Sequence, residues 1–354
     1  MGTGTASPLL LLALAGACRG AAASLPSSGP GERVERRLTV MGTWLALGVV
    51  GPDRAAALRA SEEAVRALES VEARLSTWRE DSELARLNRA PVGEPVELSP
   101  ELDQDLARAR HFWLETGGAF DPGLGALVRA WGLREGGRQP SEAELVAARA
   151  AEGLAGFEFA AGRATRRHPL ASIEEGGFGK GVGLDAAVEA LRERGVEEAV
   201  LDLGGQVAVL GDGPVTYALS DPRERDRRVL ELELGPGSLS TSGNSERGIV
   251  VDGQPRSHLL DPQSGAPAPD FGSLSVWSAD ATSADCLSTG LYVLGPQRAF
   301  SWARAHPGVE LIVLTSSGAG LACLASEGWR GRIRPLVPEL EISYPSDEPD
   351  TNQR

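Results

Sequence analysis

The spacing of apolar residues predicts amphipathic helices in the first half of the chain. Residues 52–75 place alanine, leucine and valine at helical intervals on one side. Residues 99–116 have the same pattern, with Ser99 suited to cap a helix and Pro100 suited to its first position. We expect both helices to pack on a sheet. A third helix is predicted for residues 183–195, because a glycine closes its apolar pattern.

Short apolar segments separated by turn residues predict a strand-rich second half. The predicted strands occupy residues 199–203, 206–210, 215–219, 229–234, 248–251 and 274–277. Two further helices and a closing hairpin are expected at residues 284–294, 297–305, and 309–314 with 320–325. This mixture of strand clusters and helices predicts an α+β fold. The sequence has no period of 20 to 50 residues, which argues against a solenoid.

The first residues have the composition of an export signal. The apolar run at residues 8–15 is too short to span a bilayer, and small residues precede Cys18, as in lipoprotein signals. Acylation of Cys18 would tie the protein to the periplasmic face of the inner membrane. Cleavage within residues 21–24 would instead release a soluble periplasmic protein. The sequence therefore predicts an exported protein that touches a membrane only through a lipid anchor, if at all.

The remaining organisation follows from composition. Residues 1–23 are assigned to the signal, and residues 24–37 are rich in Pro, Gly and Ser, which predicts a flexible tether. Residues 38–335 then form one folded domain. The tail at residues 336–354 is polar at its end, so we expect it to be partly disordered.

The charge of the chain restricts its ligands. Asp and Glu number 49 against 35 Lys and Arg, and the net charge of -14 argues against nucleic acid as a partner. A ligand that carries phosphate would need local help from a metal ion, a helix start or backbone N–H groups. Besides Cys18 the chain has only Cys286 and Cys323, which excludes a disulfide scaffold and a cysteine-rich metal site.

One lysine stands out, because the other 34 basic residues are arginines. Lys180 lies in the run Gly176-Gly-Phe-Gly-Lys-Gly-Val-Gly183. A P-loop needs Ser or Thr after its lysine, where this chain has Gly181, and the dinucleotide pattern does not fit either. We therefore expect a bare loop that enters a helix at Gly183 and offers N–H groups and the Lys180 charge to a phosphate. Chance survival of one lysine in an arginine-biased gene is the alternative.

Two other segments carry candidate chemistry. Asp285 and Thr289 are four residues apart, so on a helix they share one face and could share a hard cation such as Mg²⁺. A purely structural aspartate near a helix start is the alternative. His258, one of four histidines, stands before an Asp-Pro turn.

The order and spacing of these segments resemble the ApbE family, the FAD:protein FMN transferases. The resemblance covers about residues 38–330. The matching segments are residues 41–43, 76–88, 116–122 with 131–132, 176–185, 203–205, 241–243, 258–265 and 284–289. It implies an ApbE-type, T-fold-like domain in which helices pack on antiparallel sheets.

The resemblance also implies roles for individual residues. The FAD site is expected to contain Met41, Trp78, Ala119, Phe120, Asp121, Glu174, Lys180 and Leu260. The metal ligands are expected to be Asp285, Thr289 and the backbone carbonyl of Gly177. His258 is the implied general base.

Each of these residues has a structural alternative. Trp78 and Phe120 could be ordinary core aromatics, and Asp121 could serve only the turn before its proline. His258 could instead cap the Asp261-Pro turn.

The chain departs from the family pattern at a few positions. Glu174 and Glu175 precede the glycine pair where the family usually has an aspartate, which adds a charge near the flavin. Asp202 replaces a frequent asparagine and Gln206 a frequent acid. A double histidine is reduced to His258. None of these changes removes an implied metal ligand.

The resemblance implies a transferase that moves FMN from FAD, with Mg²⁺, to a Thr or Ser hydroxyl of an acceptor flavoprotein subunit and releases AMP. Two alternatives use the same pocket. The protein could be an FAD pyrophosphatase that yields FMN and AMP, or a binding protein that stores or delivers flavin without chemistry.

Overall fold

A computed structural model describes residues 31–244, 248–251, 253–317 and 320–345 of the 354-residue chain. The predicted signal with Cys18, the start of the tether and the end of the tail lie outside the described residues. Within those ranges, no helix combines the length and the apolar character that a membrane crossing requires.

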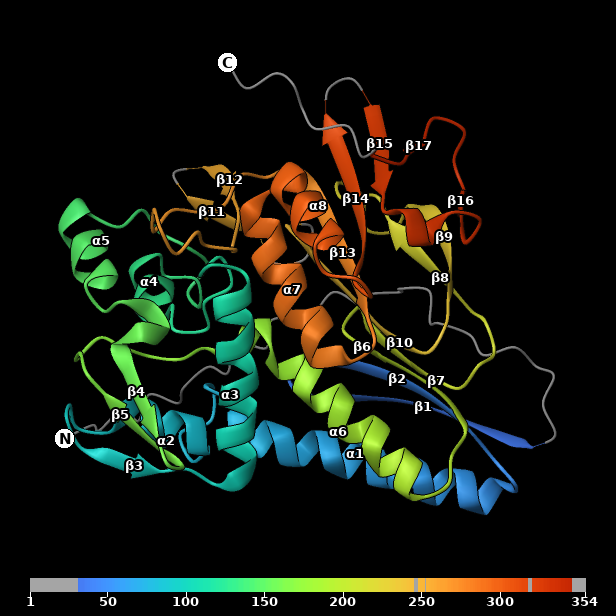
Figure 1. The fold of residues 1–354 in the computed structure, drawn as a ribbon, viewed down its shortest axis with the longest axis horizontal. Helices are drawn as coiled ribbons and strands as arrows, with labels where there is room; N and C mark the ends of the chain where they lie inside the picture. The colour runs from blue at the N-terminus through green and yellow to red at the C-terminus, as the bar shows by residue number, and fades with distance from the viewer. Residues whose placement is uncertain (1–30, 245–247, 252, 318–319, 346–354) are drawn as a thin grey trace, which may run out of the picture.

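The structure is a mixed arrangement of helices and antiparallel sheets (Figure 1), so the predicted α+β class is confirmed. In chain order, its elements are β1 (Glu32–Val40), β2 (Thr43–Gly51), α1 (Arg54–Leu75), α2 (Glu83–Arg89), β3 (Pro95–Glu97), α3 (Pro100–Glu115), α4 (Gly125–Ala130), α5 (Glu142–Arg149), η1 (Gly153–Gly156), β4 (Phe157–Ala160), β5 (Arg163–Arg166), η2 (Glu175–Gly177), α6 (Gly179–Glu193), β6 (Glu198–Leu203), β7 (Gln206–Leu210), β8 (Val215–Ser220), β9 (Arg228–Leu234), β10 (Gly237–Gly243), β11 (Ile249–Val251), β12 (Gln254–Arg256), β13 (Gly272–Ser278), α7 (Ala281–Leu294), α8 (Pro296–Arg304), β14 (Glu310–Ser317), β15 (Gly320–Ala325), η3 (Glu327–Trp329), β16 (Ile333–Pro335) and β17 (Glu341–Ser343).

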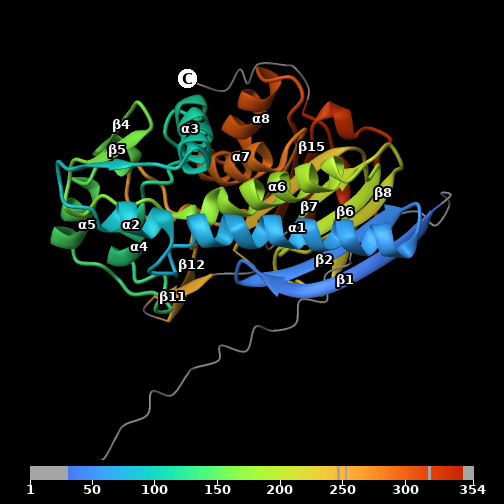
Figure 2. The same ribbon diagram turned by 90° about the horizontal axis from the view of Figure 1, so that it is seen from below.

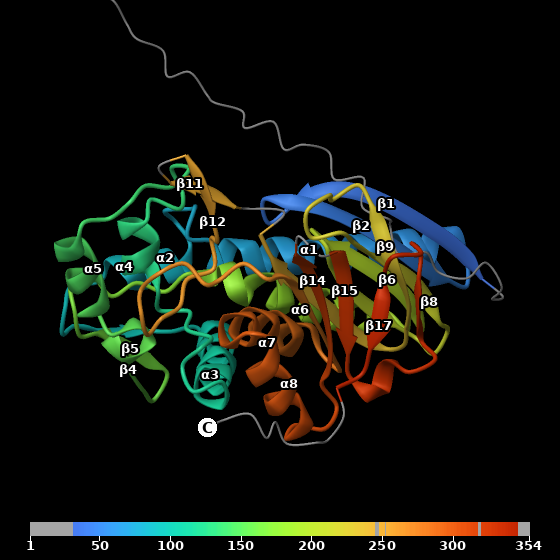
Figure 3. The ribbon, with the colours of Figure 1, turned by 90° about the horizontal axis from the view of Figure 1, so that it is seen from above.

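One long sheet organises the described part of the chain. Its strands lie in the order β1-β2-β6-β7-β10-β13-β14-β15-β17. Neighbouring strands are antiparallel except β15 and β17, which run parallel. Figure 3 shows the far end of this sheet, where β14, β15 and β17 follow one another. Smaller sheets combine β3, β5 and β4, then β16, β9 and β8, then β11 and β12.

The two faces of the long sheet bury different cores, because successive side chains of a strand point to opposite faces. In β6, Ala199 and Leu201 pack with residues of α1 and α6, whereas Val200 between them packs with residues of β8 and β9. Figure 2 shows α1 and α6 side by side along β1 and β2. The face of β10 and β13 next to them is covered by α7, which α3 also contacts.

Most predicted elements are present with small shifts at their ends. Ser99 accepts a hydrogen bond from the Leu102 N–H, and Pro100 begins α3, as the sequence predicts. The third predicted helix, however, begins at Gly179 rather than at residue 183. The glycine run is therefore a helix start and not the expected bare loop.

Both ends of the packed fold reach further than the sequence indicates. Glu32–Val40 pairs with Thr43–Gly51 along its whole length, so residues 32–37 are strand rather than tether. Near the other end, Glu341–Ser343 pairs with β15 and Leu340 is buried, so the fold continues past residue 335. Met41 lies in the β1–β2 turn with a φ of 52°.

Candidate functional site

Lys180 lies in the first turn of α6, where this helix meets the start of α7. The backbones touch there, because a methyl group on Gly181 would lie 2.5 Å from the Ala281 carbonyl oxygen. A methyl group on Gly183 would similarly lie 2.7 Å from Met41 Sδ. Glycine is a poor helix former. At position 181 glycine is required, because a side chain there would prevent α6 and α7 from coming so close.

Asp285 is the centre of this contact. It lies in the second turn of α7 and is only 3% exposed. Its Oδ2 accepts a hydrogen bond from the Gly181 N–H at 3.0 Å, and its Oδ1 lies 3.8 Å from Lys180 Nζ. Ser240 Oγ donates to the same Oδ1 at 3.5 Å. A buried carboxylate, an ammonium group and a helix start therefore converge at one point.

Serine residues of β10 extend the polar contact with α7. Ser288 Oγ lies 3.0 Å from Ser242 Oγ and 3.2 Å from Ser240 Oγ, and it donates to the Asp285 carbonyl at 3.0 Å. All of these serines are buried. The sequence did not predict a strand at this position. The polar composition of β10 is explained by its hydrogen bonds to α7.

Thr289 lies against the short η2 turn, one helical turn beyond Asp285. A methyl group on Gly177 would lie 3.3 Å from Thr289 Oγ1 and 3.2 Å from a ring carbon of Phe120. The structure thus brings the backbone of Gly177 next to Thr289, one of the two side chains implied to share a metal ion with it. Phe120 is only 1% exposed and belongs to the main core, as the structural alternative for this residue expects.

Trp78 lies at the surface and is 70% exposed. The alternative that it is an ordinary core aromatic is therefore wrong. The preceding Thr77 ties it to η2, because its N–H and its hydroxyl donate to the Glu175 carboxylate at 3.2 and 2.5 Å. The Thr77 hydroxyl also donates to Glu174 at 3.3 Å. Burial raises the pKa of Glu174 above its ordinary value. The extra acid of this chain is thus held beside an exposed indole.

Arg134 belongs to the same surface cluster as Thr77, Glu174 and Trp78, and it was not predicted from the sequence. Its guanidinium donates to Thr77 and Glu174, and it lies 4.4 Å from the centre of the Trp78 ring. An arginine over an indole face is a favourable cation–π pair. No sequence pattern links Arg134 to residues 40 and 57 positions away.

Asp121 is held mainly by backbone groups. Its Oδ1 accepts hydrogen bonds from the N–H groups of Gly123 at 2.7 Å and Leu154 at 2.9 Å. Burial raises the pKa of Asp121 to about 6. These contacts fit the turn role proposed as its alternative. Ala119 is buried nearby, next to the core residue Phe120.

His258 and Leu260 lie in the segment that leads to the Asp261-Pro turn. Leu260 is buried with Trp131, whose indole N–H donates to the Gly265 carbonyl at 2.7 Å. The turn itself is held by Asp261, which accepts hydrogen bonds from the residues two and three positions later. A hollow of about 190 Å³ has Asp121 and Pro262 in its wall, so this segment borders the Asp121 turn.

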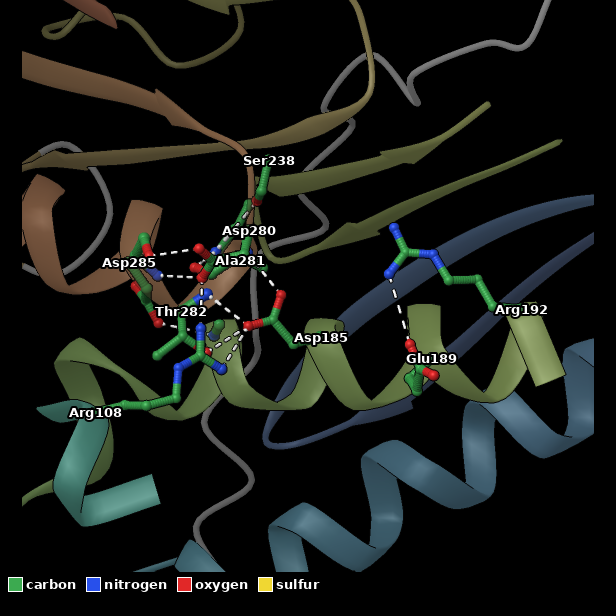
Figure 4. A network of polar contacts seen from close by, with 12 residues as sticks. Arg108, Asp185, Glu189, Arg192, Ser238, Asp280, Ala281, Thr282 and Asp285 are labelled. Atoms are coloured by element: carbon green, nitrogen blue, oxygen red, sulfur yellow. Dashed lines mark hydrogen bonds and ion pairs between the residues drawn. The ribbon is translucent and has the colours of Figure 1, made fainter. Parts of the chain in front are cut away.

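A second polar network lies beside the first and was not predicted. Arg108 of α3 donates to Asp185 of α6 and to Asp280, the residue that caps α7 (Figure 4). Asp185 also accepts from the N–H groups of Ala281 at 2.7 Å and Thr282 at 3.1 Å. The Asp185 carboxylate thus satisfies two of the open N–H groups of α7, Asp280 satisfies a third, and Asp185 fixes the start of α7 against α6.

The donor set around Asp285 suits a hard cation. Carboxylate, hydroxyl and carbonyl oxygens are the ligands that Mg²⁺ prefers, and Asp285, Thr289 and the Gly177 carbonyl would supply one of each. In the part of the chain that the structure describes, no three His, Cys, Asp or Glu side chains gather as a metal site. A cation here would therefore depend on this mixed set of oxygens and on its substrate.

The fold and this site define an α+β protein in which the start of one helix meets a buried carboxylate of another. A sequence model of the ApbE family matches residues 41–313. The chain belongs to the ApbE family, and its resemblance to that family is confirmed.

Named relatives and solved structures agree. The FAD:protein FMN transferase of Vibrio cholerae is 31% identical over 300 residues, which is 82% of this chain and 90% of the relative. That of Treponema pallidum is 31% identical over 298 residues, covering 78% and 82%. The flavin transferase ApbE structure from Vibrio cholerae has a TM-score of 0.75, with 27% identity, over 86% of this chain and all of that chain. The ApbE structure from Thermotoga maritima has a TM-score of 0.77, with 29% identity and the same coverage.

Proposed function

We propose that this protein is a transferase that moves FMN from FAD to a Thr or Ser hydroxyl of another protein. The observation that carries the proposal is the convergence of Lys180, Asp285 and the start of α6 in a chain of the ApbE family. Relatives with 31% identity bear the name FAD:protein FMN transferase. The acceptor is a flavoprotein subunit, and AMP is the second product.

The reaction exchanges one phosphorus–oxygen bond for another. The acceptor hydroxyl oxygen attacks the phosphorus of the FMN half, and the bond from that phosphorus to the bridging oxygen breaks. AMP leaves with the bridging oxygen. The hydroxyl proton passes to His258, because a neutral imidazole can accept a proton in general base catalysis.

Residues at the α6–α7 contact would stabilise the negative charges of the pyrophosphate. Asp285, Thr289 and the Gly177 carbonyl would hold Mg²⁺, which when bound neutralises pyrophosphate charge and stabilises the leaving phosphate. Lys180 places a point charge at the same phosphates, and the positive end of the α6 dipole favours an anion there. The flavin would lie toward Trp78 at the protein surface.

The remaining assignments concern flavin contacts and location. We assign the flavin pocket to Met41, Trp78, Ala119, Phe120, Asp121, Glu174 and Leu260, together with Lys180. We also propose export to the periplasm, with Cys18 as the lipid anchor, on the sequence of residues 8–24 alone.

Mass spectrometry of a purified acceptor subunit tests the function. The acceptor is incubated with this protein, FAD and Mg²⁺, and a matched acceptor has its target Thr replaced by Ala. We expect a covalent FMN adduct on the first acceptor only, together with AMP. Free FMN without an adduct would indicate a pyrophosphatase instead, and unchanged FAD would indicate a binding protein.

A further inference from the structure

The ammonium group of Lys180 points at an oxygen that also belongs to the candidate metal site. Lys180 Nζ lies 3.8 Å from Asp285 Oδ1, whereas the other carboxylate oxygen, Oδ2, accepts the Gly181 N–H. The Asp285 side chain is 4% exposed and that of Lys180 is 26% exposed. The lysine thus reaches from the more open side toward a buried carboxylate.

The guanidinium group of the neighbouring polar network already has two carboxylate partners. Arg108 is bound to Asp185 and Asp280. Lys180 differs from such a residue because its ammonium is a compact charge on a flexible stem, with no fork that holds it to one carboxylate. The lysine can therefore leave Asp285 without breaking a bidentate pair.

We propose that Lys180 is a mobile counter-ion that occupies the cation position at Asp285 until FAD binds. When FAD is present, the ammonium moves to the pyrophosphate and leaves the carboxylate to the metal ion. The inference rests on the proposed function, because it takes Asp285 as a metal ligand and FAD as the substrate. It adds an order of binding, in which the metal ion binds weakly until FAD is bound.

The physical basis is repulsion between like charges. A divalent ion bound to Asp285 Oδ1 would lie within a few ångströms of an ammonium that remains in place, in a largely buried setting. FAD removes this conflict by supplying phosphate oxygens to the lysine. By thermodynamic linkage, FAD and the metal ion must then raise each other's affinity by the same factor.

Binding of Mn²⁺ without FAD tests the inference directly. Mn²⁺ accepts the same oxygen ligands as Mg²⁺, and its free concentration is measured by electron paramagnetic resonance. We expect Lys180→Met to bind Mn²⁺ at least tenfold more tightly than the wild type, which corresponds to about 1.4 kcal/mol. Lys180→Arg keeps the charge and should stay within about threefold of the wild type. The titration is run at about pH 8, so that a carboxylate left without its counter-ion remains ionised.

Arg192→Gln is the matched control. It removes one positive charge from the same helix at an exposed residue near its end, which pairs with Glu189 (Figure 4). Its Mn²⁺ affinity should equal that of the wild type. The double variant Lys180→Met/Asp285→Asn should lose the gain, because it lacks the carboxylate. Melting temperatures of all variants establish that each is folded.

The coupling with FAD gives a second readout. In the wild type, saturating FAD should tighten Mn²⁺ binding at least tenfold. In Lys180→Met this factor should be smaller, by as much as the variant gains without FAD, because only the direct attraction between the metal ion and the pyrophosphate remains. Equal or weaker Mn²⁺ binding by folded Lys180→Met without FAD overturns the inference, even if the wild type forms the FMN adduct. A tenfold gain without any adduct upholds the competition and rejects only the proposed transfer.

Discussion

Gly181→Ala tests the helix contact on which the site depends. The added methyl group would lie 2.5 Å from the Ala281 carbonyl oxygen and 2.6 Å from the Thr282 Cα. Both are backbone atoms, so α6 and α7 must move apart. Overpacking of this kind costs roughly 1–3 kcal/mol, and the better helix propensity of alanine returns up to about 1 kcal/mol. We therefore expect a net loss of about 1–2 kcal/mol and a melting temperature lower by about 1–3 °C.

The same variant should affect activity more than stability. Separation of the helices lengthens the 3.0 Å hydrogen bond from the Gly181 N–H to Asp285, and it displaces a candidate metal ligand. We expect the rate of adduct formation per folded molecule to fall at least tenfold, since small displacements at a reacting centre have large effects. Gly176→Ala is the control, because a methyl group there meets no atom within 4 Å. A melting temperature and a rate equal to those of the wild type in both variants would contradict the close contact between α6 and α7.

Three further predictions concern single side chains. Asp285→Asn should abolish Mg²⁺-dependent transfer while the protein stays folded, and a wild-type single-turnover rate would remove Asp285 from the site. His258→Ala should retain FAD and Mg²⁺ affinity by calorimetry and lose roughly 10²–10⁴-fold in single-turnover rate; a loss of melting temperature with an unaltered rate would instead support a role in the turn. Because the pKa of Asp121 is raised to about 6, folding takes up a proton at this residue between about pH 4 and 6, and the contribution of Asp121 to wild-type stability falls as pH rises across that window. Asp121→Asn should remove this fall, so its melting temperature relative to wild type should rise across that window, and a constant difference would contradict the assignment.

Helix ends set by local chemistry were predictable from the sequence. The hydrogen bond from the Leu102 N–H to Ser99 Oγ joins residues three positions apart, so the start of α3 is encoded in a few neighbouring side chains. The apolar pattern of α1 likewise matches its buried face. Such signals act within one or two helical turns.

The start of α6 and the strand β10 were not predictable in this way. Glycine at positions 179, 181 and 183 argues against a helix by propensity alone, yet the close approach of α7 requires it at position 181, and Met41 leaves no room for a side chain at position 183. Ser238, Ser240 and Ser242 break the expected apolar pattern of a buried strand. Their hydroxyl groups form hydrogen bonds with residues of β7 and α7, which lie far away in the sequence.

The sequence by itself determined which residues were worth attention in the candidate site. Composition singled out Lys180, and helical spacing placed Asp285 and Thr289 on one face. Only the tertiary structure decided that Lys180 reaches Asp285, which is 105 residues away, and that Arg134 covers Trp78. Local patterns cannot specify such contacts, because they depend on which helix faces meet and how closely two backbones approach.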